Sequence, residues 1–224
     1  EGEFVWLVGD DDLLLSDSIV RLCRLIEDYP LVDFFFGNSF HLTTEFVDCF
    51  DRPFDTSNLP TEMEPFSKWR NDGELPFLDL IDPSVSFDFL GGMFLSIFRK
   101  KCWDKYVNVL DENAIMDDRV FSHFDNTFPH IKIFAHAFSQ SLAYFNSSPL
   151  NVCLTGAREW SSMSPLIMSV RLVEAIDIYR NNGLPYLRYL YCKNFALRNF
   201  IPDFVNMVLH SKNSGFEYFN CSFL

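Results

Sequence analysis

The sequence predicts an α/β fold in which strands and helices alternate, followed by a helical C-terminal region. Residues 3–8 form an apolar run of strand-forming residues that stops at a glycine and three acids, so we expect a buried strand there. A helix follows, and Ser16 is placed to cap it. Its buried face is marked by apolar residues at helical spacing: Ile19, Leu22, Cys23 and Ile26. Residues 31–36 are predicted to form a second strand, and this order of elements is typical of an α/β layer.

The middle of the chain is predicted to contain a long loop and an interrupted apolar segment. Residues 38–82 lack periodicity and contain several prolines and acids, so we expect an irregular segment with one short helix, of the kind that is often functional. Residues 87–98 are apolar but interrupted by two glycines, and a helix is expected over residues 100–106. The later elements are predicted as a helix over 127–141 with Pro129 in its first turn, a short strand over 142–145, and helices over 163–181, 185–200 and 202–210.

The composition indicates a globular chain. Hydrophobic residues make up 48% of the 224 residues, enough for one medium domain with an appendage. No stretch approaches the roughly 18 unbroken apolar residues that a membrane-spanning helix requires. The six cysteines occur singly, without a CxxC pair, which favours a reduced cytoplasmic protein.

The net charge of −13 disfavours nucleic acid as a partner, because the average electrostatic interaction with a phosphate backbone would be repulsive. The charge is unevenly distributed along the chain. Acids concentrate in residues 1–125, whereas residues 158–212 are mildly basic and could face an anionic partner.

Three adjacent carboxylates, Asp10, Asp11 and Asp12, directly follow the first predicted strand. In open α/β sheets, ligands bind at the carboxyl edge of the strands. A hard divalent cation relieves repulsion between neighbouring carboxylates and keeps coordination positions for phosphate oxygens. The turn therefore indicates a Mg²⁺ or Mn²⁺ site for a diphosphate, with a merely solvated acidic turn as the alternative.

The run EFVWLVGDDDLLLSDSIV resembles the strand, DXD motif and following helix of family 2 inverting glycosyltransferases. The resemblance implies a Rossmann-like GT-A fold, that of nucleotide-diphospho-sugar transferases, over residues 1–145 and a helical extension over residues 146–224. It assigns the metal and sugar-diphosphate contacts to Asp11 and Asp12, with Asp10 as the alternative first member of the motif. Family members begin with nucleotide-binding strands that have no counterpart here, so we expect this chain to be the back part of the catalytic domain, and inactive by itself.

A second segment, FLGGMF at residues 89–94, resembles the Gly-Gly segment that borders the acceptor pocket in the same family. The resemblance places Gly91 and Gly92 in the binding site. Glycines permit close approach of the backbone to a ligand and offer unhindered amides. The alternative is a tight turn or β-bulge that binds nothing.

In this family a carboxylate downstream of the glycines is the catalytic base, and Asp117 and Asp118 occupy that window. The acceptor hydroxyl must lose its proton as it attacks the anomeric carbon opposite the leaving diphosphate. Two adjacent acids also raise the pKa of one of them, which suits a base. A helix-capping acid pair is the alternative, and Asp111 and Glu112 compete for the catalytic role.

Two further residues could contact the substrates. His130 follows a proline at a helix start, where its imidazole could contact the diphosphate or pack against Phe134 as a structural histidine. Trp160 could stack on a sugar ring or belong to a core or an interface.

These motifs predict a metal-dependent glycosyltransferase that moves a sugar, with inversion, from a nucleotide-diphosphate donor to a hydroxyl of a saccharide or lipid-linked saccharide. The family implies bacterial surface-polysaccharide biosynthesis, by an enzyme in the cytoplasm or held peripherally at the inner face of the cell membrane. Two other hypotheses stay open: a metal-dependent phosphoryl or nucleotidyl transferase, and a noncatalytic interaction module with acidic loops. Phosphoryl transfer calls for a Gly-rich loop with Lys or Arg, which is not evident in the sequence.

Overall fold

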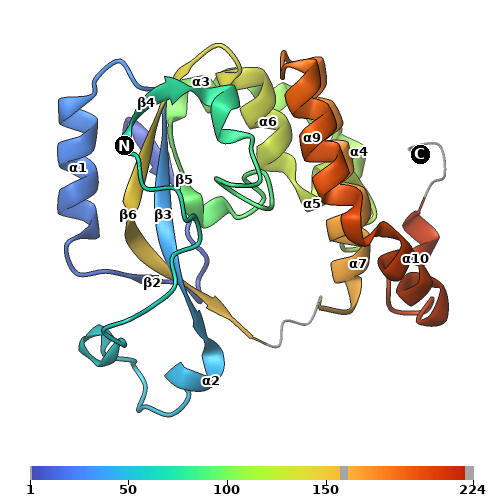
Figure 1. The fold of residues 1–224 in the computed structure, drawn as a ribbon, viewed down its shortest axis with the longest axis horizontal. Coiled ribbons are helices and arrows are strands. Elements are labelled where there is room, and N and C mark those ends of the chain that lie inside the picture. Colours follow the sequence, from blue (N-terminus) through green and yellow to red (C-terminus); the bar gives the residue numbers. More distant parts are fainter. Residues whose placement is uncertain (1, 157–160, 220–224) are drawn as a thin grey trace.

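The computed structural model describes residues 2–156 and 161–219, and its fold is mixed α/β (Figure 1). The described strands are β1 (Phe4–Trp6), β2 (Leu13–Leu14), β3 (Phe34–Thr43), β4 (Gly73–Pro76), β5 (Ser96–Arg99) and β6 (Leu142–Thr155). The described helices are α1 (Ser18–Asp28), α2 (Thr44–Val47), α3 (Lys100–Tyr106), α4 (Glu112–Ile115), α5 (Phe124–Thr127), α6 (Pro129–Phe138), α7 (Ser164–Leu166), α8 (Leu172–Asn181), α9 (Tyr186–Ala196) and α10 (Phe200–Leu209). One turn of π-helix, Ile167–Arg171, joins α7 to α8.

The strands form one mixed sheet in the order β1-β5-β3-β6-β2, with β4 also paired to β6. The pairing of β3 with β6 is parallel, and the other pairings are antiparallel. Since β1 and β3 are both antiparallel to β5, they run in the same direction. The carboxyl ends of β1, β3 and β6 therefore meet at one edge of the sheet, where ligand sites of open α/β sheets are found.

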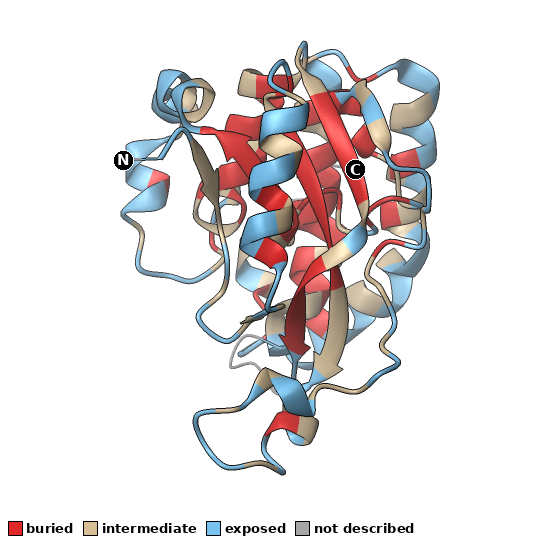
Figure 2. Ribbon diagram, turned by 90° about the vertical axis from the view of Figure 1, so that its left-hand side faces the viewer, coloured by how far each residue is buried: buried red, intermediate tan, exposed pale blue. Residues whose placement is uncertain are grey.

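Each face of the sheet is covered by helices, and the central strands are buried between them (Figure 2). On one face Phe35 packs in a cluster with Leu22 of α1. On the other face, Phe34 makes edge-to-face contacts with Phe134 and Phe138 of α6, at centroid distances of 5.2 and 5.4 Å. Because successive side chains of a strand point to opposite faces, the apolar run of β3 serves both cores.

Several predicted elements are confirmed. The first strand lies within residues 3–8, α3 spans the predicted residues 100–106, and α6 begins at Pro129. The C-terminal region is helical as expected. The predicted cap at Ser16 is wrong, because α1 begins at Ser18 and its N-cap is Asp17. Within the described part of the chain, no helix combines the length and the apolar character needed to cross a membrane.

Strands β3 and β6 are longer than predicted. The expected strand over residues 31–36 begins at Phe34 and continues to Thr43, and the expected strand over 142–145 continues to Thr155. The added residues of the two strands pair with each other in parallel. The register shifts between Gly37, which opposes Asn146, and Ser39, which opposes Asn151. The predicted boundary between residues 145 and 146 consequently falls inside β6.

A buried guanidinium group ties the three strands at the β1 side of the sheet together. Arg99, at the end of β5, is 7% exposed and donates from Nε to Asp33 Oδ1 at 2.7 Å. Its Nη1 donates to Glu3, next to β1, and its Nη2 donates to the carbonyl oxygens of Pro30 and Val32 at 2.9 and 3.1 Å. Such a group stabilises the fold only while its partners remain paired. The arrangement fixes the position of β1, and with it the start of the acidic turn.

Replacing Arg99 with methionine is expected to lower the free energy of unfolding by about 3 kcal/mol, because the Asp33 carboxylate loses its partner in a partly buried position. Urea unfolding followed by tryptophan fluorescence measures the loss. The exposed ion pair of Arg52 with Asp48 supplies the control, since Arg52→Met is expected to cost less than about 1 kcal/mol. Similar losses in the two variants would contradict the role assigned to Arg99.

Candidate functional site

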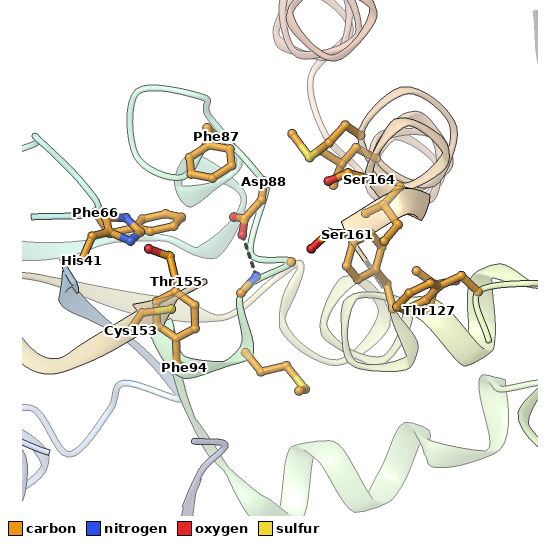
Figure 3. Close-up of a pocket in the computed structure, with 18 of the residues that line it drawn as sticks. His41, Phe66, Phe87, Asp88, Phe94, Thr127, Cys153, Thr155, Ser161 and Ser164 are labelled. Carbon is orange, nitrogen blue, oxygen red and sulfur yellow. Dashed lines mark hydrogen bonds between the residues drawn. The ribbon is translucent and has the colours of Figure 1, made fainter. Parts of the chain in front are cut away.

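A cavity of about 520 Å³ opens at the carboxyl edge shared by β3 and β6. His41 from β3 and Cys153 and Thr155 from β6 form its floor, and the loop before β5 and the residues that lead into α8 form its walls (Figure 3). The described lining residues include no Lys or Arg. The volume is within the range of small-molecule sites, roughly 300–1,000 Å³.

One carboxylate, that of Asp88, lies among the lining residues. Its Oδ1 accepts a hydrogen bond from the Ser86 hydroxyl, and its Oδ2 accepts one from the Gly92 amide at 2.7 Å (Figure 3). Burial raises the pKa of Asp88, and the two donors act in the opposite direction because they favour the ionised form. The Asp88 carboxylate is therefore a hydrogen-bond acceptor whose orientation is fixed by Ser86 and Gly92, in a largely apolar cavity.

The backbone between Asp88 and the glycines has an uncommon conformation. Phe89 and Leu90 are in the left-handed region, with φ of 53° and 70°, and both side chains are fully buried. Residues of this kind cost about 1–3 kcal/mol each and persist only where surrounding contacts hold them. Here the Tyr179 hydroxyl donates to Phe89 O, and His130 Nε2 donates to Leu90 O, each at 3.2 Å.

His130 is placed as a structural histidine. It is 3% exposed, packs edge-to-face on Phe134 at 5.6 Å, and is not among the cavity-lining residues. Burial lowers its pKa to about 4. The hydrogen bond to Leu90 requires the proton on Nε2, because a carbonyl oxygen only accepts. Of the two roles predicted for His130, contact with a diphosphate or packing against Phe134, the geometry fits packing. His130 also supports the turn at Phe89 and Leu90 through its hydrogen bond to Leu90 O.

Gly91 and Gly92, predicted to belong to a binding site, both line the cavity. The reason for the second glycine is local: a Cβ at Gly92 would lie 3.1 Å from Asp88 Oδ2 and 2.8 Å from the Phe94 ring. Its amide is used by Asp88 and is not left for a ligand. The glycine pair therefore positions the carboxylate within the cavity.

Aromatic side chains form one wall of the cavity. Phe66 and Phe87 stack at a centroid distance of 5.0 Å and an interplanar angle of 25°. Phe94 meets Phe66 edge-on at 5.6 Å, and His41 lies 5.1 Å from the same ring. Phe87 is 42% exposed, so this wall presents an aromatic surface to incoming molecules.

The wall opposite the aromatic side chains contains two irregular backbone features, a π-helical turn and a residue with a left-handed φ. Ile167 and Met168, in the π-helical turn, line the cavity, and Phe121 lines it with a left-handed φ of 61°. Arg171 anchors this segment by donating to the carbonyl oxygens of Phe121 and Ser122, and it pairs with Glu174. Single π-turns inside helices occur often at functional sites.

The acidic turn is attached to the cavity at both of its ends. Before the turn, Trp6 Nε1 donates to Phe94 O at 2.8 Å. After it, Asp12 Oδ1 accepts from Leu154 N at 3.3 Å, between the lining residues Cys153 and Thr155. The turn is thus hydrogen-bonded to backbone beside the cavity, but Asp10, Asp11 and Asp12 are not among the described lining residues.

The three acids of this turn differ in environment. Asp10 and Asp11 are exposed, whereas Asp12 is partly buried and its Oδ2 also accepts from Gly9 N at 3.2 Å. Burial, with Asp11 adding to it, raises the pKa of Asp12, while its amide donors lower it. A Cβ at Gly9 would lie 2.8 Å from Asp11 Oδ1, the end of an exposed side chain that can move aside, so packing does not require glycine at this position. Among the described residues, no group of three His, Cys, Asp or Glu side chains is arranged to hold a metal ion.

The predicted base candidates lie away from the cavity lining. Asp117 accepts hydrogen bonds from the Arg119 guanidinium, at 2.5 Å to Nη2, and interacts with His123 Nε2 at 3.0 Å. These hydrogen bonds hold the pKa of Asp117 well below its usual range, which opposes the raised pKa expected of an acid pair. Asp118 is exposed. Asp111 caps α4 by accepting from Asn113 N and Ala114 N, and Glu112 opens that helix.

The chain matches no protein-family model, no curated protein and no solved structure. The candidate site therefore depends on the geometry of the chain itself. Trp160, for which the sequence left open sugar stacking or a place in a core or an interface, is outside the described residues.

Sequence reasoning missed Asp88 and the aromatic wall. Asp88 precedes the glycine pair by three residues, and that proximity is the only signal in the sequence. His41 and Phe66 come from a segment without periodicity, so nothing local indicated that they would meet Phe87.

The buried neutral state of His130 predicts a pH dependence of stability. Between the ordinary His pKa of 6.5 and the folded value of about 4, the unfolded chain binds a proton that the folded chain does not. Stability therefore falls as pH falls through this window, by up to about 3 kcal/mol from this group. Urea unfolding at pH 7 and pH 4 measures it, and His130→Gln should remove this part of the loss.

The comparison between variants isolates His130, since every other titrating group is shared. His210 is exposed, and His210→Gln serves as the control that should keep the wild-type dependence. An unchanged pH dependence in His130→Gln would show that His130 is not held neutral.

Proposed function

We propose that this protein is a glycosyltransferase of GT-A type that moves a sugar from a nucleotide-diphosphate donor to a hydroxyl acceptor with inversion. The observation that carries the proposal is that the segment with the acidic turn is hydrogen-bonded to the backbone beside a cavity that the glycine pair lines. These hydrogen bonds join Trp6 to Phe94 and Asp12 to Leu154. The resemblance of both segments to family 2 enzymes supports the same function.

The two parts of the site suit two substrates of different charge. Asp10 and Asp11 are exposed carboxylates at a sheet edge, and these residues would hold Mn²⁺ or Mg²⁺, which supplies charge neutralisation for the donor diphosphate. The cavity has no Lys or Arg among its described lining residues, so it suits an uncharged acceptor. The same lack of cations argues against a phosphoryl-transfer cavity, which would need them to bind phosphate.

A peripheral position at the inner face of a membrane is part of the proposal, since lipid-linked saccharides are among the expected acceptors. The C-terminal helices support it with exposed apolar side chains: Leu187, Leu190 and Tyr191 on α9, and Ile201, Val205, Val208 and Leu209 on α10. These positions recur every three or four residues, as on one face of a helix.

The metal-binding role of the acidic turn can be tested with variants that separate an effect on sugar transfer from an effect on folding. With protein produced from the complete gene, Asp11→Asn is expected to lower sugar transfer at least about a hundredfold at low Mn²⁺ while the melting temperature stays within about 2 °C, because an exposed carboxylate contributes little to packing. Asp12→Asn should lower both transfer and melting temperature, since its carboxylate accepts two main-chain amides. Transfer from a panel of nucleotide sugars and thermal unfolding are the two measurements.

Asp17 provides the matched control for this experiment. It is an exposed acid five residues further along, at the start of α1, and Asp17→Asn is expected to leave transfer unchanged. Wild-type turnover in Asp11→Asn and Asp12→Asn, at both low and saturating Mn²⁺, would refute the assignment of the donor site.

A further inference from the structure

Among its described lining residues, the cavity combines an aromatic surface with one carboxylate and no Lys or Arg. Phe66 and Phe87 present stacked rings on one side, and Asp88 lies directly after Phe87 in the chain. Figure 3 shows the Asp88 carboxylate between Phe87 and the hydroxyl-bearing Ser161 and Thr155. Aromatic faces and precisely placed polar groups together suit a ligand that is apolar on one face and hydroxylated at its rim.

Asp88 has acceptor capacity left for such a ligand. A carboxylate offers roughly four acceptor positions. The Ser86 hydroxyl and the Gly92 amide occupy two of them, and the amides of Asp88 and Leu90 also act on this carboxylate. The turn is rigid, because Phe89 and Leu90 are held in the left-handed conformation by Tyr179 and His130. A carboxylate fixed in this way keeps its direction without paying rotamer entropy when a ligand arrives.

We propose that this cavity binds a neutral hexopyranoside acceptor, with the apolar ring face against Phe87 and Phe66 and a hydroxyl donating to Asp88. Asp88 is then the catalytic base of the transfer, in place of the Asp117 and Asp118 pair. The inference rests on the proposed function for its chemical step, but the binding of the pyranoside can be tested without it.

The chemical step transfers the sugar of the proposed nucleotide-diphosphate donor to the acceptor hydroxyl. As the acceptor oxygen forms its bond to the anomeric carbon, its proton passes to an Asp88 oxygen. The bond between the anomeric carbon and the diphosphate oxygen breaks, and the electron pair leaves with the nucleoside diphosphate. Burial, which raises the pKa of Asp88, favours the proton transfer.

Binding is tested first, without donor or metal. Methyl β-D-glucopyranoside, methyl β-D-galactopyranoside and methyl α-D-mannopyranoside are titrated into the 224-residue chain, followed by saturation-transfer NMR and calorimetry. At least one is expected to bind, and Asp88→Asn is expected to weaken it about tenfold, since a hydrogen bond to a charged group is lost. Phe87→Ala should weaken it about fivefold, and thermal unfolding of this variant checks that it still folds, since the side chain is 42% exposed but stacks on Phe66.

Each variant has a control of the same chemical kind outside the cavity. Asp82 also accepts hydrogen bonds from a serine, Ser84, but lies outside this cavity, so Asp82→Asn should bind like wild type. Tyr186, on α9, is 57% exposed and is the aromatic control, as Tyr186→Ala. Methyl β-D-glucuronide tests the charge, and we expect it to bind at least about tenfold more weakly than the glucoside because the described lining residues include no Lys or Arg to pair with its carboxylate.

The base role is tested with protein from the complete gene and the donor found by the transfer assay. Asp88→Asn is expected to reduce transfer at saturating acceptor at least about a hundredfold, with donor affinity within about twofold of wild type. If pyranosides bind and depend on Asp88 while no donor supports transfer, the proposed function fails and the binding site stands. If none of the three glycosides binds, or if binding ignores both Asp88→Asn and Phe87→Ala, the inference is overturned. Loss of transfer in Asp118→Asn with full transfer in Asp88→Asn would return the base role to Asp118.

Discussion

The parallel pairing of β3 with β6 is the constraint on which the site depends. It joins segments more than a hundred residues apart and directs both carboxyl ends to the same edge of the sheet. His41 and Thr155 meet in the cavity floor for that reason. The one break in the ladder is filled by Asn38, which donates to the carbonyl oxygens of Ser67 and Ser147 at 2.9 Å each. The side chain thereby also ties the loop that carries Phe66 to the sheet.

The turn that carries Asp88 shows how the core supports an uncommon backbone. Two consecutive left-handed residues would not persist in a solvated loop, because each costs free energy relative to ordinary conformations. Their side chains are buried, and their carbonyl oxygens are satisfied by His130 from α6 and Tyr179 from α8. The packing of these two helices on the sheet is therefore what holds the carboxylate in the cavity. A change in that packing would reach the site without touching a lining residue.

Much of the fold could be predicted from local signals, and much of the site could not. Pro129 and the apolar spacing after it predict α6, because both act within one helix. The extension of β6 was missed because Asn146 to Pro149 is polar and contains a proline, as in a turn, and only pairing with β3 keeps the strand going. The acidic turn and the glycine pair were recognisable as motifs. The aromatic wall was not, since His41, Phe66 and Phe87 are brought together by the tertiary structure alone.

The charges of the site are divided between its two parts, and Asp12 lies at the boundary. Exposed carboxylates at positions 10 and 11 make the turn suited to cations. The described lining of the cavity contains one carboxylate, that of Asp88, among apolar and hydroxyl groups. Both oxygens of Asp12 accept main-chain amides, so its charge stabilises the junction of the turn with β6. The carboxylates of both regions repel an anion, so binding of an anion in either region is unfavourable unless a cation binds with it. For the proposed function, this division of charge favours a metal-bound diphosphate at the turn and an uncharged hydroxyl compound in the cavity.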